Sequence, residues 1–215
     1  DVLKALNTPK ATDRLRALES AVKIAQFPPV DPRMVNNHIH TTYSFSPYSP
    51  AAAVYAARME GLATCGIVDH DSIGGAREFI EAGRIVGIPT TIGIETRVSF
   101  AETALKDRRT NNPDQIGNSY MVLHAIPHGN IDKVQAYFAP LRERRNERNR
   151  KMIARINELY AGDGVSLEFE RDVLPLSQYS DSGSVTERHL MLALARQLLA
   201  QGKAKLPENA TELEV

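Results

Sequence analysis

The sequence has a single cysteine, no net charge and no long apolar run, and each of these features excludes a class of protein. With only Cys65, an internal disulfide framework and a cysteine-rich zinc module are excluded, so a reducing cytoplasm is the expected location. No segment approaches the ~20 consecutive apolar residues of a membrane span, so no membrane partner is expected.

The charges balance, with 26 basic and 26 acidic residues among 215. This balance disfavours a generic polyanion-binding surface, so nucleic acid as a partner is not indicated by the net charge. A hydrophobic content of 42% is enough for a folded core, and the length is that of one ordinary domain.

Helical and extended patterns alternate through the first 130 residues. Residues 1–32 predict a helical lead-in that ends at a proline-rich linker. Ser49 and Pro50 predict the start of a helix that ends near residue 60. Together the patterns predict extended segments and helices at 34–40, 50–60, 64–68, 75–86, 89–94 and 120–126. This alternation is typical of an α/β fold with right-handed crossovers and a parallel sheet.

The remaining segments predict a loop and further helices. The polar residues 101–118 are expected to form a surface loop. A long helical stretch covers 131–159, with an expected interruption near Pro140. A final helix is predicted over 185–201, where Ser184 and Glu187 have the spacing of a capping box.

Histidine and carboxylate residues recur at the ends of the predicted strands. His38 and His40 are two apart in an extended segment, so both imidazoles leave the same face. In a parallel sheet, the carboxyl ends of the strands meet at one edge. The residues that follow the other strands are Asp69, His70, Asp71, Glu95 and His124.

Such a gathering of polar groups is costly unless the groups have partners. A shared cation is one partner, and a structural network of His–carboxylate pairs is the alternative. Imidazoles and carboxylates without a thiolate suit Mn, Fe or Zn better than a soft metal, and the number of imidazoles disfavours Mg and Ca. Cys65 lies early in its strand and is expected to be a small buried hydrophobe.

The motifs occur in a recognisable order: Asn37-His-Ile-His-Thr-Thr42, then Gly66-Ile-Val-Asp-His-Asp71, then Gly93-Ile-Glu95, then His124. Together they resemble the PHP (polymerase and histidinol phosphatase) family of metal-dependent phosphoesterases. The resemblance implies a distorted (β/α) barrel with a cluster of about one to three divalent ions at its mouth. The implied metal ligands are His38, His40, His70, Glu95 and His124. Glu95 would bridge ions, and Asp69 and Asp71 would orient imidazoles.

The resemblance also implies how the chain is divided. Residues 33–130 would form the N-terminal half of the barrel, 131–183 a helical insertion, and 184–215 the return to the barrel and a tail. Two family features are missing: Ser44-Phe45-Ser46 stands where an acidic ligand is common, and the sequence contains no late Asp-x-His. The barrel is therefore expected to be incomplete at its C-terminal end.

Four arginines are candidates for phosphate binding, because a guanidinium can donate two parallel hydrogen bonds. Arg145 and Arg148 are neighbours on one helix face, although a solvated face with ion pairs explains the same run. Arg97 follows Glu95 and fits either a phosphate clamp or a structural ion pair. Arg188 opens the last predicted helix, whose N-terminus attracts anions.

The leading hypothesis is hydrolysis of a small phosphoester by metal-activated water. His128 or His189 would protonate the leaving oxygen. One alternative is an amidohydrolase-like enzyme, which typically carries a carbamylated lysine on a middle strand, but the predicted strands contain no lysine. The other alternative is a metal-stabilised module that binds a phosphorylated ligand without turnover.

Overall fold

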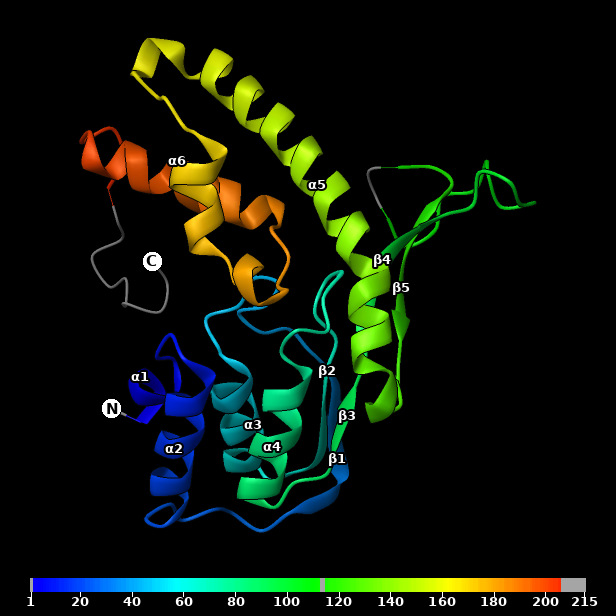
Figure 1. The fold of residues 1–215 in the computed structure, drawn as a ribbon, viewed down its shortest axis with the longest axis vertical. Coiled ribbons are helices and arrows are strands. Elements are labelled where there is room, and N and C mark those ends of the chain that lie inside the picture. The colour runs from blue at the N-terminus through cyan, green and yellow to red at the C-terminus, as the bar shows by residue number, and fades with distance from the viewer. Residues whose placement is uncertain (1, 113–114, 206–215) are drawn as a thin grey trace.

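A computed structural model describes residues 2–112 and 115–205 of the chain (Figure 1). The helices of the N-terminal half are α1 (Val2–Leu6), α2 (Ala11–Val22), α3 (Pro50–Met59) and α4 (Ala76–Val86). The strands are β1 (Asp31–Ile39), β2 (Leu62–Ile67), β3 (Thr90–Ile92), β4 (Ile94–Ser99) and β5 (Asn118–Leu123). The mixed α/β class predicted from the sequence is confirmed.

The strands form two sheets. Strands β1, β2 and β3 are parallel and lie in that order, with Ile39 opposite Ile67 and Ile67 opposite Ile92. Strands β4 and β5 form an antiparallel pair in which Glu95 faces Val122. Among residues 2–112 and 115–205 the strands number five and do not close a barrel.

The expectation that the strand near residue 120 runs parallel to the others is wrong. A parallel connection needs a crossover of a dozen or more residues, usually a helix. The described part of segment 100–117 has turns and no helix, so the chain folds back and β5 runs antiparallel to β4. The carboxyl end of β5 therefore lies at the amino end of β4.

Local signals set the helices that cover the parallel sheet. The Ser49 hydroxyl accepts a hydrogen bond from the Ala52 amide at 3.1 Å, which confirms the predicted cap of α3. Gly87 ends α4 in the left-handed conformation, with φ of 74°. Apolar side chains of α3, α4 and the parallel strands form the first hydrophobic cluster, with Phe79 and Val54 fully buried.

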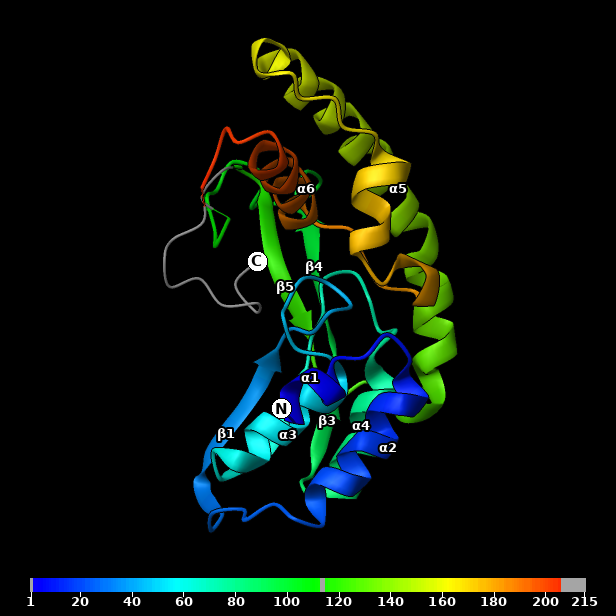
Figure 2. The same ribbon diagram turned by 90° about the vertical axis from the view of Figure 1, so that its left-hand side faces the viewer.

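The C-terminal half is helical. It contains α5 (Ile131–Leu159), α6 (Glu187–Ala200) and the short turns η1 (His128–Asn130), η2 (Ala161–Asp163), η3 (Phe169–Val173), η4 (Leu174–Leu176) and η5 (Tyr179–Asp181). Helix α5 runs from beside the sheet to the far end of the molecule (Figures 1 and 2). Its last turns pack with η3 and α6 in a second hydrophobic cluster that includes Ile153, Val173 and Leu190.

Two predictions about these helices are wrong. Helix α5 is continuous through Pro140, because Pro140 and Ala136 are both exposed and water can satisfy the carbonyl that the proline leaves free. Helix α6 begins at Glu187, and its capping box is formed by Thr186 and His189 instead of Ser184 and Glu187. Among the described residues, no helix is both long enough and apolar enough to cross a membrane.

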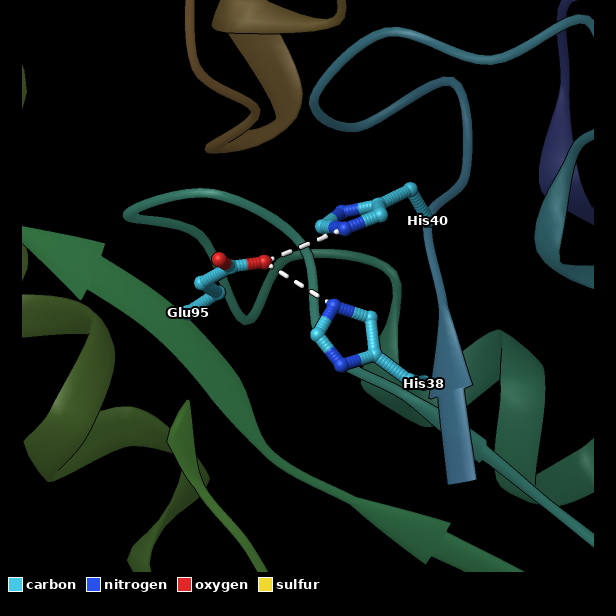
Figure 3. A group of neighbouring side chains, drawn as sticks. All are labelled: His38, His40 and Glu95. Atoms are coloured by element: carbon cyan, nitrogen blue, oxygen red, sulfur yellow. Dashed lines mark hydrogen bonds and ion pairs between the residues drawn. The ribbon is translucent and has the colours of Figure 1, made fainter. Parts of the chain in front are cut away.

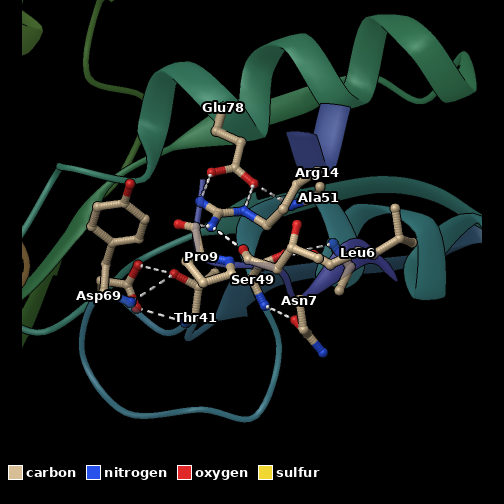
Figure 4. Close-up of polar contacts among 12 residues, drawn as sticks. Leu6, Asn7, Pro9, Arg14, Thr41, Ser49, Ala51, Asp69 and Glu78 are labelled. Atoms are coloured by element: carbon tan, nitrogen blue, oxygen red, sulfur yellow. Dashed lines mark hydrogen bonds and ion pairs between the residues drawn. The ribbon is translucent and has the colours of Figure 1, made fainter. Parts of the chain in front are cut away.

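A buried ion pair joins three of the N-terminal helices. The Arg14 guanidinium on α2 donates to both carboxylate oxygens of Glu78 on α4, at 2.8 and 2.5 Å (Figure 4). Glu78 also accepts a hydrogen bond from the Ala51 amide in the first turn of α3. Both charged side chains are almost fully buried, at 3% and 4% exposure, so each depends on the other as its counter-ion.

Removing one partner of this pair is expected to destabilise the protein strongly. Glu78→Gln leaves the buried Arg14 charge uncompensated and should lower the free energy of unfolding by about 3–5 kcal/mol. The matched control is Glu81→Gln on the same helix, since its partner Arg84 is 69% exposed. Urea unfolding followed by circular dichroism measures both, and equal losses in the two variants would contradict the prediction.

Cys65 is fully buried in β2, as the sequence predicted. Burial raises the pKa of its thiol to about 12. The thiolate is the reactive form, so only about 10⁻⁴ of the thiol is ionised at pH 8.

Iodoacetamide at pH 8 should therefore leave the native protein unmodified and alkylate Cys65 fully once urea has unfolded the chain. Intact-mass spectrometry before and after denaturation measures this. Rapid modification of the native protein would show that the thiol is neither buried nor protonated.

Candidate metal centre and adjoining cleft

Three side chains from two strands meet around one carboxylate oxygen (Figure 3). The Nε2 atoms of His38 and His40, on and just after the end of β1, each lie 3.1 Å from Oε2 of Glu95, near the start of β4. All three ligand atoms lie within 4.8 Å of one another. The two-residue spacing of the histidines brings both imidazoles to Glu95, as the sequence predicted.

Backbone pairing positions Glu95. Its amide donates to the Asp69 carbonyl at 3.1 Å, and its carbonyl accepts from the Asp71 amide at 2.8 Å, which forms a parallel bridge opposite His70. His70 therefore lies beside Glu95, with Nδ1 3.8 Å from Oε2. The His70 ring also stacks on His40, with ring centroids 4.4 Å apart.

The electrostatic environment keeps two of these imidazoles neutral. Burial lowers the pKa of His40 to about 4, and the nearby imidazole of His70 acts in the same direction. Burial likewise lowers the pKa of His70 to about 4, aided by the charge of Arg145. At neutral pH both rings are in the form that ligates metals.

The donor set fits a divalent ion. Three imidazoles and a carboxylate without a thiolate form a ligand set typical of Mn, Fe or Zn sites. Nδ1 of His40 is buried and has no hydrogen-bond partner in the described part of the chain. A cation among these four side chains would also compensate Glu95, which has no cationic partner among the ion pairs of the described residues apart from histidine.

A cleft of about 350 Å³ opens beside this cluster. Its lining includes His40, His70 and Glu95 of the cluster, together with Arg145, Glu187 and Arg188 from α5 and α6. We call the part that carries Arg145 and Arg188 the arginine wall. The cleft therefore combines a candidate metal site with cationic groups that could bind an anion.

The four predicted arginines differ in their relation to the cleft. Arg145 and Arg188 line it directly. Arg148 forms an ion pair with Glu187, which lines the cleft. Arg97 donates a hydrogen bond at 2.6 Å to the hydroxyl of Tyr120, another lining residue.

The two aspartates that were expected to orient imidazoles have other partners. Asp69 accepts hydrogen bonds of 2.6 Å from the amide and hydroxyl of Thr41 and from the hydroxyl of Ser44 (Figure 4). Burial raises the pKa of Asp69 to about 6, against the opposing effect of these hydrogen bonds. Asp71 contacts Arg145 and Thr96. Asp69 thus fixes the loop after β1, whereas Asp71 contacts Arg145, which lines the cleft.

Three predicted histidines lie outside the cluster. His124 follows β5 and is exposed; its backbone lies beside Gly93, close to the start of β4, but His124 is neither in the group of His38, His40 and Glu95 nor among the residues that line the cleft. His128 is exposed in η1. His189 is 2% exposed, and its Nδ1 accepts a hydrogen bond from the Thr186 amide at 3.0 Å, so it caps α6. Its ring also packs edge-on against Phe45, with ring centroids 4.8 Å apart. Neither His128 nor His189 is among the residues that line the cleft.

Four lining residues were not predicted as site residues. Phe45 lies in the loop after β1, Tyr120 lies on β5, Thr186 is the N-cap of α6, and Glu187 is its first residue. The sequence contains one indirect signal for Glu187. It directly precedes Arg188, which was predicted to bind phosphate at the start of the last helix, so it is expected to lie near the same site. The contacts of Phe45 and Tyr120 depend on tertiary packing.

No protein-family model matches the chain. Error-prone DNA polymerases from Mycobacterium bovis and Mycobacterium tuberculosis are 35% identical over 94 residues. That match covers 43% of this chain and 8% of the length of each polymerase.

Two solved structures share the fold. A protein from Bifidobacterium adolescentis, assigned as a metal-dependent phosphoesterase, matches with a TM-score of 0.58 and 20% identity, over 88% of this chain and 59% of its own. The resemblance predicted from the sequence is confirmed at the level of the fold. An amidohydrolase from Chromobacterium violaceum, solved with sulfate and no metal, matches with a TM-score of 0.57 and 23% identity, over 79% of this chain and 51% of its own.

Metal binding should depend more on Glu95 than on His124. Glu95→Gln removes the charged oxygen that His38 and His40 both approach, and it should reduce Mn²⁺ affinity by about 100-fold or more, since even outer partners of metal ligands contribute 10–100-fold. His124→Ala should cause a much smaller loss because His124 lies outside the cluster.

Isothermal titration with Mn²⁺ and elemental analysis measure both variants. An equal or larger loss in His124→Ala would show that the end of β5 contributes a metal ligand.

Proposed function

We propose that the protein is a metal-dependent hydrolase whose substrate is a small phosphomonoester or nucleotide phosphate. The single observation that carries this proposal is one cleft lined both by His40, His70 and Glu95 of the cluster and by Arg145 and Arg188. Candidate metal ligands and guanidinium groups in one cleft match the two needs of phosphoryl transfer, activation of a nucleophile and compensation of oxyanion charge.

The proposed metal-binding residues are His38, His40, His70 and Glu95. His124, which the family resemblance also implies as a ligand, lies outside this cluster and is not part of the proposed site. A bound divalent ion of Mn, Fe or Zn would supply Lewis-acid chemistry, lowering the pKa of water and polarising a phosphoryl oxygen. Because the pKa values of His40 and His70 are low, both imidazoles are neutral at neutral pH, and protons do not compete with the metal ion for their nitrogen atoms.

The arginine wall would bind and orient the phosphate. Arg188 is exposed at the cleft and has no hydrogen bond or ion pair with another described residue, so its guanidinium is available to a ligand. Arg145 is 11% exposed, and its guanidinium lies in the wall of the cleft. Two guanidinium groups can hold a phosphate through paired hydrogen bonds.

The proton for the leaving oxygen has no clear donor among the predicted histidines. His128 and His189 do not line the cleft, and His189 is engaged as a helix cap. We therefore assign this proton to solvent water.

Substrate class is supported more by the arginine wall than by the metal cluster, because amidohydrolases use similar metal ligands. A carbamylated lysine, which is typical of amidohydrolase barrels, would need a lysine at the cluster, and no lysine lines the cleft in the described part of the chain. The match to DNA polymerases covers only 8% of their length, so polymerase activity is not part of the proposal.

Activity should require both the metal and Glu95. Protein loaded with Mn²⁺ should hydrolyse at least one member of a panel of nucleoside monophosphates and sugar phosphates, and EDTA should abolish the activity. Glu95→Ala should lower kcat/KM by about 100-fold or more. Glu81→Ala, which removes an exposed carboxylate of α4, is the control and should retain wild-type activity.

Phosphate release measured by a colorimetric assay tests this directly. Amide hydrolysis without inhibition by inorganic phosphate would favour the amidohydrolase alternative. Tight phosphate binding without turnover of any substrate would favour a phospho-ligand-binding module.

A further inference from the structure

We propose that Asp71 is a positioning residue for the arginine wall, acting through Arg145 to set the affinity for the substrate phosphate. This inference rests on the proposed function in one respect, namely that phosphate lies against Arg145. It assigns to Asp71 a role different from the orientation of an imidazole that its place beside His70 first indicated.

The side chain of Asp71 bridges two elements. One carboxylate oxygen, Oδ2, lies 2.9 Å from Nη1 of Arg145 on α5. The other, Oδ1, accepts a hydrogen bond of 2.6 Å from the Thr96 hydroxyl on β4. Both charged side chains are largely buried, with 14% of Asp71 and 11% of Arg145 exposed. Competition from water is therefore weak, which strengthens the attraction between the two charges.

The backbone of Asp71 reinforces this link. Its amide donates to the Glu95 carbonyl at 2.8 Å, and its own carbonyl accepts from the Arg142 guanidinium at 3.4 Å. Asp71 has a φ of 51°, in the left-handed region that L residues rarely adopt and that aspartate tolerates better than most. The conformation lets one residue bond to β4 with its amide and to α5 with its carbonyl.

Asp71 and its hydrogen-bond partner Thr96 are each adjacent in sequence to a proposed metal ligand. Asp71 follows His70, and Thr96 follows Glu95. The Arg145 guanidinium is thus held by the same two short segments that carry His70 and Glu95. Asp71 thereby fixes the distance between these two proposed metal ligands and the guanidinium of Arg145.

The other arginines of the cleft lack this connection. Arg148 pairs with Glu187 of α6, and both side chains are about 40% exposed. Arg188 has no described partner and is exposed. Only Arg145, among the arginines that line the cleft in the described structure, is held by a carboxylate next to a proposed metal ligand.

A double-mutant cycle tests whether Asp71 acts through Arg145. The proteins are wild type, Asp71→Asn, Arg145→Met and the double variant, all loaded with Mn²⁺. Asparagine keeps the size of the side chain and an acceptor for Thr96, and it removes the charge that holds Arg145. For each protein, KM and kcat are measured with the best phosphomonoester, and the Kd of inorganic phosphate is measured by calorimetry.

Asp71→Asn should raise KM and the Kd of phosphate by about tenfold, which corresponds to loss of one hydrogen bond to a charged group, while kcat falls much less. Arg145→Met should have at least as large an effect. The double variant should resemble Arg145→Met alone, because Asp71 has no further effect on phosphate once its partner is gone. Bound Mn²⁺, from elemental analysis, should be equal in all four.

The control is Asp132→Asn, which removes the carboxylate of an exposed ion pair with Arg77 outside the cleft and should leave every value at the wild-type level. Effects that multiply in the double variant, or loss of Mn²⁺ from Asp71→Asn, would overturn the proposal, because Asp71 would then act on the metal site or on the fold.

The phosphate titration separates this inference from the proposed function. If the wild type binds phosphate but hydrolyses no phosphoester, the proposed function fails. The phosphate Kd values of the four proteins in the double-mutant cycle then still decide the role of Asp71. If the wild type with Mn²⁺ binds no phosphate, the positioning role is overturned, because Arg145 would not be an anion-binding group.

Discussion

The backbone bridge between His70 and Glu95 is the interaction on which the site depends. Two hydrogen bonds, from Glu95 to Asp69 and from Asp71 to Glu95, extend the parallel pairing beyond β2 and carry it onto β4. The bridge joins the three-stranded sheet to the antiparallel pair. Together with the direct continuation of β3 into β4 through Gly93, it holds Glu95 beside His70.

Part of the site could be predicted from the sequence because it depends on short-range geometry. The alternation of side chains along a strand is enough to bring His38 and His40 to one face, and parallel strands deliver residues that follow them to a common edge. Those two rules predict the meeting of His38, His40, His70 and Glu95. The cap at Ser49 and the burial of Cys65 are equally local properties.

The errors arise where long-range contacts decide. The strand before His124 carries a short apolar run, as β2 does, and only its pairing with β4 shows that it runs in the opposite direction. His189 was expected to protonate the leaving oxygen, yet it caps helix α6 from a buried position. The partner of Arg145 was not predictable, because Asp71 lies 74 positions earlier and faces it only after α5 has docked.

Helix α5 belongs to both halves of the protein. Ile131 is buried with the N-terminal cluster, and Ile153 and Ile156 are buried with the C-terminal one. Between them lie Arg145 and Arg148, at the level of the cleft. Since a helix is stiff over this length, the positions of both guanidinium groups depend on how α5 packs in the N-terminal and in the C-terminal hydrophobic cluster. Evolution of ligand preference can therefore proceed through apolar substitutions at either end of α5, without altering any residue that touches the ligand.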